Sequence, residues 1–220
     1  MHNQEHRTMR IYAAADLHGR SEHLATLAEG LRRCRADVLV LAGDLLQYGR
    51  GRELLPALEA FPVPVLMVRG NSDPGFVERW AAAAHNLRSL HLVSVSLNGF
   101  DFVGAGGTLP IPFYSLIGWR EPHVLARLAP LLHSRSILVA HSPPRGCRDK
   151  VLGRFHAGSR GLAKLLARRA PAVMICGHIH EAAGVERLGA TLVVNCALGA
   201  GRRGALITVA DGQPPCAELL

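Results

Sequence analysis

Five apolar segments of this chain each end in polar residues of the kinds that bind metal ions. The residues that follow them are Asp16 and His18, then Asp44, Asn71 and His141, and finally His178 and His180. Each segment is a short continuous apolar run, which is typical of a strand buried on both faces of a sheet. In open α/β sheets, ligands gather beyond the carboxyl ends of the strands. The pattern therefore predicts that these polar side chains converge at one edge.

The segments between these runs predict an alternation of strands and helices. Apolar spacing predicts helices over about 22–35, 51–60, 73–86, 121–134 and 159–170, with Ser21 and Ser159 as N-caps. Asn98-Gly99 between two strand-like runs predicts a β-hairpin, and strands within 185–197 and 204–211 close the chain. We therefore expect an α/β fold with mixed sheets and outer helices, as one domain over 9–220 after a tail at 1–8.

The donor set points to a particular metal chemistry. Asp16 with His18, and His178 with His180, stand two residues apart, which places both side chains of a pair on one face of an extended chain. Nitrogen and oxygen donors without cysteine suit Mn, Fe, Zn or Ni. Seven ligands are too many for one catalytic ion, which needs an open position, and they suit two ions sharing a carboxylate. Asp44 is the natural bridge, and two such ions favour hydroxide attack on phosphorus.

The ordered motifs resemble those of the calcineurin-like metallophosphoesterase superfamily. They are Asp-x-His at 16–18, Gly-Asp at 43–44, Gly-Asn at 70–71, His141, and Gly-His-x-His at 177–180. The segments HAGSRGLAKLL and CGHIHEAAG are similar to those of its small bacterial and archaeal predicted phosphoesterases. The resemblance covers about 11–195 and implies a four-layer α/β/β/α sandwich of two mixed β-sheets with helices outside.

The resemblance also implies roles for individual residues. One metal ion would be held by Asp16, His18 and His180, the other by Asn71, His141 and His178, and Asp44 would bridge them. The implied activity is a dinuclear metal-dependent phosphoesterase, in which metal-bound hydroxide attacks a phosphodiester or a small phosphorylated metabolite in line. We expect a phosphodiesterase rather than a monoesterase, with Mn²⁺ as the most effective ion in vitro.

The chain departs from the family pattern at Ser72. Many relatives have a histidine at that position, which stabilises the transition state or protonates the leaving group, whereas serine is a poor acid at neutral pH. Proton donation would then fall to metal-bound water, to Asp73 if its pKa is raised, or to another histidine, for which His156 is our candidate.

Four residues are expected to contact the substrate phosphate. Arg20 and Arg145 follow the ligands His18 and His141 closely in sequence, and a guanidinium matches phosphate oxygens in a bidentate manner. Asn71 and Ser72 complete the set. The Gly-x-Gly-x-x-Gly match at 199–204 precedes a strand-like run, so it does not indicate a dinucleotide site.

Composition excludes several classes of protein. A hydrophobic content of 49% argues against disorder, and no apolar run reaches the ~18 residues of a membrane span. The polar start does not fit a secretory signal. Five scattered cysteines without a Cys-x-x-Cys pair favour a reducing, cytoplasmic location and no membrane partner.

The net charge of +8 favours anionic partners. It keeps open the alternative of a nuclease or nucleic-acid-binding phosphoesterase, although the arginines are scattered and we prefer a small phosphorylated substrate. A second alternative is a non-catalytic metal-binding scaffold for protein interaction. Missing ligand residues would favour it, but every ligand position is filled. The sequence leaves the oligomeric state open.

Overall fold

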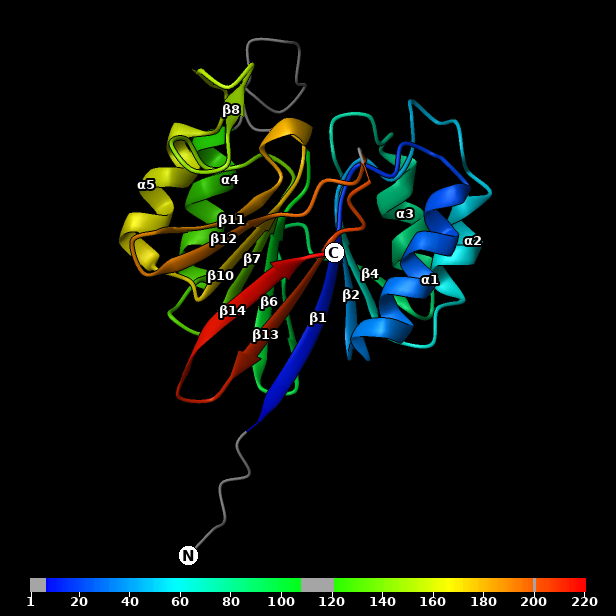
Figure 1. Ribbon diagram of the computed structural model, residues 1–220, viewed down its shortest axis with the longest axis horizontal. Coiled ribbons are helices and arrows are strands. Elements are labelled where there is room, and N and C mark those ends of the chain that lie inside the picture. The colour runs from blue at the N-terminus through cyan, green and yellow to red at the C-terminus, as the bar shows by residue number, and fades with distance from the viewer. Residues whose placement is uncertain (1–6, 108–120, 200) are drawn as a thin grey trace, which may run out of the picture.

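The computed structural model describes residues 7–107, 121–199 and 201–220, and two mixed β-sheets dominate this part of the chain (Figure 1). The first sheet has the strand order β14 (Gln213–Leu219), β13 (Ala205–Ala210), β1 (Thr8–Ala14), β2 (Val38–Ala42), β3 (Val65–Val68) and β4 (Leu87–Ser89). The second has the order β11 (Gly184–Leu188), β12 (Thr191–Asn195), β10 (Val173–Cys176), β7 (Ile137–Ala140), β6 (Phe100–Ala105) and β5 (Ser94–Leu97). A small hairpin pairs β8 (Lys150–Val151) with β9 (Phe155–His156).

Helices cover the outer face of each sheet (Figure 1). The first sheet is covered by α1 (Glu22–Cys34), α2 (Leu54–Glu59) and α3 (Phe76–Ala83). The second is covered by α4 (Glu121–Leu128), which continues into the 3₁₀ helix η2 (Ala129–Leu131), and by α5 (Arg160–Arg169). A further 3₁₀ helix, η3, spans His180–Ala182. The architecture is the predicted four-layer α/β/β/α sandwich.

Alternation along β1 shows why the layers form. Ile11 and Ala13 pack between the two sheets, whereas Tyr12 and Ala14 pack beneath the outer helices. Because successive side chains of a strand point to opposite faces, a continuous apolar run fills two cores at once. The central strands β1, β2 and β3 run parallel, as do β6, β7, β10 and β12. Their carboxyl ends therefore lie at the same end of the sandwich.

The local signals in the sequence have mixed outcomes. The Asn98-Gly99 turn joins β5 and β6 with both residues at positive φ, as the hairpin prediction requires. Ser159 caps α5 by accepting a hydrogen bond from the Leu162 amide (2.9 Å), but Ser21 makes no side-chain cap on α1. The predicted helix over 121–134 ends its α-helical part at Leu128.

Three predicted boundaries or elements are wrong. Strand β1 begins at Thr8, which pairs with Ala210, so residue 8 does not belong to a tail; residues 1–6 lie outside the described part. Four strands close the chain instead of two, because β11 and β12 form a hairpin and β14 extends the first sheet. Strand β14 was not predicted because two prolines lie near its start, and prolines are unusual in strands. They are tolerated here because β14 is an edge strand. Among the described residues, no helix is long and apolar enough to span a membrane.

Candidate metal centre

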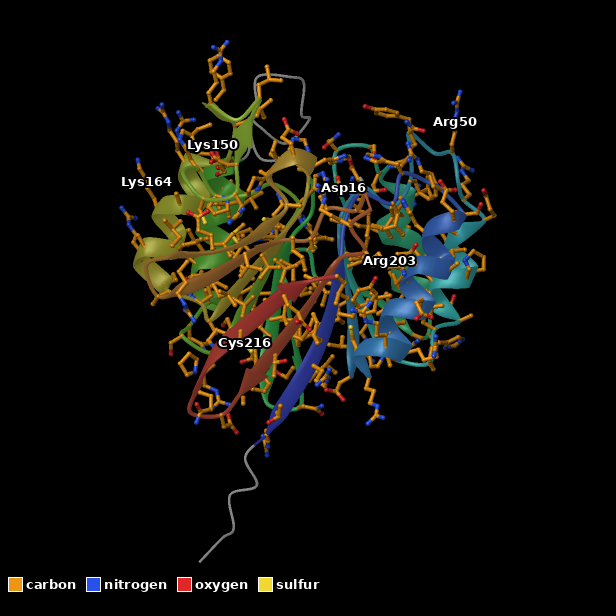
Figure 2. The ribbon with its side chains drawn as sticks, viewed as in Figure 1. Asp16, Arg50, Lys150, Lys164, Arg203 and Cys216 are labelled. Atoms are coloured by element: carbon orange, nitrogen blue, oxygen red, sulfur yellow. The ribbon has the colours of Figure 1, made fainter. Side chains whose placement is uncertain are left out.

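The seven predicted ligands all follow the carboxyl ends of strands at one end of the sandwich. Asp16 follows β1, Asp44 follows β2, Asn71 follows β3, His141 follows β7, and His178 and His180 follow β10. Figure 2 shows Asp16 at this end, between the two halves of the molecule. Backbone hydrogen bonds join the first two loops: the Asp16 amide donates to the Gly43 carbonyl (3.0 Å) and the His18 amide to the Asp44 carbonyl (2.9 Å).

Each of the two aspartates fixes a neighbouring ligand loop with one carboxylate oxygen. Oδ1 of Asp44 accepts a hydrogen bond from the Ser72 amide (2.8 Å), next to Asn71. Oδ2 of Asp16 accepts one from the His178 amide (2.9 Å) and so joins the two sheets. The other oxygens face the histidines: Asp44 Oδ2 lies 3.5 Å from His141 Nε2, and Asp16 Oδ1 lies 3.2 Å from His180 Nε2.

His141 is held with one ring nitrogen free for a ligand role. Its Nδ1 lies 2.8 Å from the Ala42 carbonyl, which can only accept, so Nδ1 carries the proton. A hydrogen bond of this kind fixes the tautomer and the ring orientation of a metal-ligating histidine. Nε2 faces Asn71 Oδ1 and His178 Nδ1, both at 3.2 Å. Three donors from three loops therefore surround one point.

The ligand atoms form two overlapping groups. The first contains Asp16, His18 and His180, and the second contains Asp16, Asp44 and His141. The first group is partly open, with 24% of the His18 side chain and 44% of the His180 side chain exposed, whereas the His141 side chain is fully buried. One position therefore faces solvent, where a substrate can enter, and the other lies deeper.

The charges in the group are strongly coupled. Burial alone would lower the pKa of His141, but the Asp44 and Asp16 carboxylates raise it to about 9. The same contact with His141 lowers the pKa of Asp44, against the effect of its burial. Burial and the neighbouring His141 lower the pKa of His178 to about 4. A divalent cation would take the place of the protons that hold these carboxylates and imidazoles together.

Two further observations fit a bound cation. Oδ1 of Asp16 and Nδ1 of His18 are buried and have no hydrogen-bond partner among the described residues, and such orphaned atoms are costly in a protein interior. Four of the ligands, namely Asp16, His18, Asp44 and His178, have positive φ angles between 50° and 68°. Residues other than glycine rarely adopt this conformation, and it concentrates at functional sites.

Ser72 and Asp73 do not occupy the positions that the sequence analysis assigned to them. The Ser72 hydroxyl is buried and donates to the Leu46 carbonyl (2.6 Å), so it offers no contact to a substrate. The Asp73 carboxylate is buried and accepts hydrogen bonds from the amides of Leu46 (2.7 Å), Gly70 (2.8 Å) and Leu45 (3.1 Å). Burial raises its pKa, but its oxygens face the backbone, so Asp73 joins the two ligand loops and is not placed as a proton donor.

The predicted phosphate contacts differ from one another. Arg20 is exposed on the loop after His18. Arg145 is held in the second half of the molecule, where its guanidinium donates to the His156 carbonyl (2.8 Å). Asn71 lies at the centre of the ligand group through its contact with His141. Asn71 is therefore one of the metal-facing residues, whereas Arg20 is an exposed residue on the neighbouring loop.

His156 has a partner that the sequence analysis missed. Its Nδ1 lies 2.6 Å from Oδ1 of Asp149, a carboxylate that is 1% exposed. The two residues stand seven positions apart across the turn of the β8–β9 hairpin. Asp149 directly precedes β8 and His156 ends β9, so the pairing of the two strands brings the side chains together.

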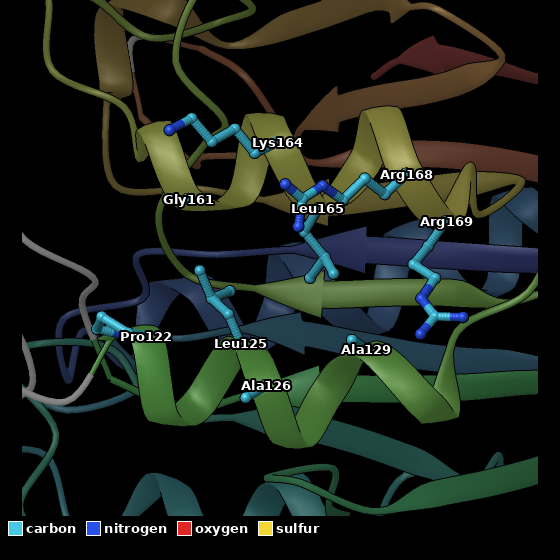
Figure 3. A pocket seen from close by; sticks show the side chains of 9 residues that line it. All are labelled: Pro122, Leu125, Ala126, Ala129, Gly161, Lys164, Leu165, Arg168 and Arg169. Carbon is cyan, nitrogen blue, oxygen red and sulfur yellow. The ribbon is translucent and has the colours of Figure 1, made fainter.

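Two cavities lined by described residues lie away from the ligand group. One of about 340 Å³ lies between α4 and α5, with Leu125 and Leu165 in its lining and Lys164, Arg168 and Arg169 around it (Figure 3). Another of about 320 Å³ lies at the opposite end of the sandwich, beside Phe100 and Arg135.

The sequence profile of calcineurin-like phosphoesterases matches residues 9–182, which include all seven ligand positions. The chain belongs to this family. It is 29% identical over 202 residues to the uncharacterized protein MJ1162 of Methanocaldococcus jannaschii, and the match covers 85% of this chain and 87% of that protein.

Solved structures share the calcineurin-like fold. The crystal structure of TT1561 of Thermus thermophilus superposes with a TM-score of 0.72 at 21% identity, covering 92% of this chain and 98% of the other. A dimetal phosphatase from Danio rerio superposes with a TM-score of 0.64 at 13% identity, covering 96% and 98%. At these identities the similarity shows the fold alone. For this calcineurin-like phosphoesterase, the chemistry must be argued from its own residues.

Proposed function

We propose that this protein hydrolyses phosphate esters with the help of two divalent metal ions, and that it prefers a diester to a monoester. The observation that carries the proposal is the pair of carboxylate oxygens, Oδ1 of Asp16 and Oδ2 of Asp44, that face His18, His141 and His180 at the metal-facing end of the sandwich. A donor set of this composition suits borderline divalent ions. Asp16, His18 and His180 would hold one ion, and Asn71, His141 and His178 the other, with Asp44 between them.

When bound, two such ions activate a water and neutralise the phosphoryl oxygens in an in-line displacement. The chain contributes the rest. The hydrogen bonds from Ser72 and His178 to the aspartates hold the ligand loops in register before the substrate arrives. Such prior organisation lowers the cost of reaching the transition state. The half-exposed ring of His180 and the exposed Arg20 lie where a phosphate would enter.

The two-ion hypothesis and the substrate class rest on separate grounds. The two overlapping donor groups support two ions, and the structurally similar protein from Danio rerio is described as a dimetal phosphatase. The preference for a diester and a cytoplasmic location remain predictions from the sequence, as does Mn²⁺ as the most effective ion.

The first experiment measures hydrolysis of bis-p-nitrophenyl phosphate and p-nitrophenyl phosphate by metal-stripped protein refilled with Mn²⁺, Ni²⁺, Fe²⁺ or Zn²⁺. We expect metal-dependent cleavage of the diester that is lost in Asp44→Asn. Faster cleavage of the monoester would overturn the diester preference alone.

Absence of turnover with every ion, although two ions bind per chain by elemental analysis, would overturn the enzymatic proposal and favour the scaffold alternative. A nucleic-acid enzyme would instead bind single-stranded DNA or RNA with an affinity that falls steeply as salt rises, because phosphate contacts release counterions. Weak binding that is insensitive to salt would exclude it.

A further inference from the structure

Hydrolysis of an ester with a poor leaving group needs a proton donor, and the loop after β3 does not supply one. The Ser72 hydroxyl donates its hydrogen bond to the Leu46 carbonyl, and the Asp73 carboxylate accepts hydrogen bonds from three backbone amides. A general acid must lie beside the leaving oxygen and must carry its proton when the ester binds. The candidate proton donors are therefore the histidines that do not face the predicted metal positions.

Three such histidines are His23 in the first turn of α1, His91 after β4, and His156 in β9. His23 bonds through Nδ1 to the Leu17 carbonyl (3.0 Å), and His91 accepts the Gly106 amide on Nδ1 (2.9 Å). Neither bond involves a carboxylate, and burial lowers the pKa of His91, which disfavours its protonated form. His156 differs because its Nδ1 bonds to the buried carboxylate of Asp149 at 2.6 Å.

The contact with Asp149 holds the His156 ring in one orientation. A carboxylate on Nδ1 fixes the tautomer and orients the ring, so that Nε2 is the nitrogen available to a substrate. Asp149 is itself held, since its Oδ2 accepts the Gly158 amide (3.0 Å). The His156 ring is 35% exposed, and its Nε2 makes no hydrogen bond within the described part of the chain.

The β8–β9 hairpin that carries His156 is tied to the segments of two metal-facing residues. On one side, the Leu152 amide donates to the carboxylate of Glu181 (3.2 Å), which is adjacent to His180. On the other, Ser159 pairs with the chain just after His141: its amide donates to the Pro143 carbonyl and its carbonyl accepts the Arg145 amide, both at 2.9 Å. Figure 1 shows β8 at the same end of the molecule as the ligand loops.

The charged groups around His156 are of both signs. Asp149 lies against the ring, Lys150 is its cross-strand neighbour, and the guanidinium of Arg145 donates to its backbone carbonyl (2.8 Å). The cations suit an approaching phosphate, while the single carboxylate is directed at Nδ1. The hairpin that carries this ring lies at the metal-facing end, and Nε2 is the ring nitrogen that is not bonded to Asp149.

We propose that His156 donates the proton that the leaving group of the ester requires, and that Asp149 is its positioning residue. The proposal rests on the proposed function. Water attacks phosphorus and releases one proton to solvent, the bond from phosphorus to the leaving oxygen breaks with its electron pair, and the Nε2 proton passes to that oxygen. The imidazole then regains one proton from solvent, so the cycle consumes one water and no net proton at His156.

The test compares His156→Asn with the parent protein on a series of diaryl phosphates, from p-nitrophenyl to unsubstituted phenyl esters, with Mn²⁺. Asparagine keeps a donor near the Nδ1 position for Asp149 but has no group at Nε2. We expect kcat/KM to fall by about 10²–10⁴ for the least acidic phenols and to change by less than about threefold for p-nitrophenol, which leaves without a proton. Asp149→Asn should show the same trend with a smaller amplitude.

The matched control is His133→Asn. His133 also bonds to a carboxylate, Asp101 (2.9 Å), but it precedes β7 at the opposite end of the sandwich. This variant should leave the whole series unchanged.

The outcomes separate the two proposals. A uniform loss across the series in His156→Asn would mean that the residue only supports the hairpin, and unchanged rates would mean that it takes no part; either result overturns the role of His156 alone. A parent protein that cleaves no ester with any metal ion would overturn the proposed function itself.

Discussion

The two ends of the β-sandwich hold similar residues in opposite ways. At the end formed by the carboxyl ends of the strands, aspartates and histidines lie close together. Two of their buried atoms, on Asp16 and His18, have no hydrogen-bond partner in the part of the chain that the structure describes. At the other end, Asp101 pairs with His133 (2.9 Å) and Asp211 with Arg135 (2.6 Å). The second set consists of simple ion pairs in contact with solvent.

This difference separates a prepared site from ordinary surface structure. The metal-facing end keeps four ligand residues at positive φ, and it leaves Oδ1 of Asp16 without a hydrogen bond from the described residues; both features cost stability. The opposite end carries no such costs in the pairs described. Positive φ also occurs at the opposite end, at Arg35, Asn98 and Ala170, so the physical mark of function is the gathering of such costs on neighbouring metal-ligating side chains. This distinction can be tested by perturbing each end in turn.

The largest expected difference comes from His141→Ala. His141 contacts Asp44, Asn71 and His178 from a fully buried position. Its loss should lower metal-dependent turnover on the order of a thousandfold or more, since even the partners of metal ligands cost 10–100-fold. Metal content by elemental analysis should fall with it, while circular dichroism should show a retained fold. A folded variant with full turnover would remove His141 from the site.

Asp73→Ala tests whether this end also contains a purely structural carboxylate. The change leaves the buried amides of Leu45, Leu46 and Gly70 without their acceptor. Unpaired buried donors cost ~1–3 kcal/mol each and are not additive, so we expect the free energy of unfolding to fall by about 3 kcal/mol in denaturant titrations. By contrast, Asp44→Asn should lose activity with a smaller change in stability. Equal stability losses in the two variants would erase the distinction.

The sequence predicted the site better than its surroundings. Every predicted metal ligand lies at the metal-facing end, because a buried strand must stop where its polar residue emerges and parallel strands stop together. Side-chain contacts between distant loops were not predictable in this way. The bonds from Asp73 to the loop after Asp44, and from Asp149 to His156, depend on tertiary packing that no local pattern encodes. Strand β14 was not predicted for the same reason, because it forms by pairing with β13 and its own composition does not indicate a strand.

Gly70→Ala tests how closely the backbone must approach Asp44. A Cβ at this position would collide with Oδ1 and the amide of Asp44, so the carboxylate must move. We expect at least about a tenfold loss of turnover, as small misplacements of catalytic groups carry large costs. Gly75→Ala is the matched control in the same loop, because its Cβ meets nothing within 4 Å and its φ is −60°. If both variants kept full activity, the close approach would not matter for the site.

The smallest expected effect is at the opposite end, in Asp101→Asn. Hydrogen bonds from the Ser96 hydroxyl and the His133 ring lower the pKa of Asp101 below its usual range. A lowered pKa in the folded state contributes stability above the unfolded value of ~3.9 and loses it as pH falls toward the folded value. Because the carboxylate is exposed to solvent, the contribution should stay below about 1 kcal/mol. The parent and the variant should therefore differ slightly in unfolding free energy at pH 5 and converge at pH 3, with turnover unchanged. A difference that grows at pH 3 would reverse the sign of the argument, and a loss of turnover would show that the two ends are coupled.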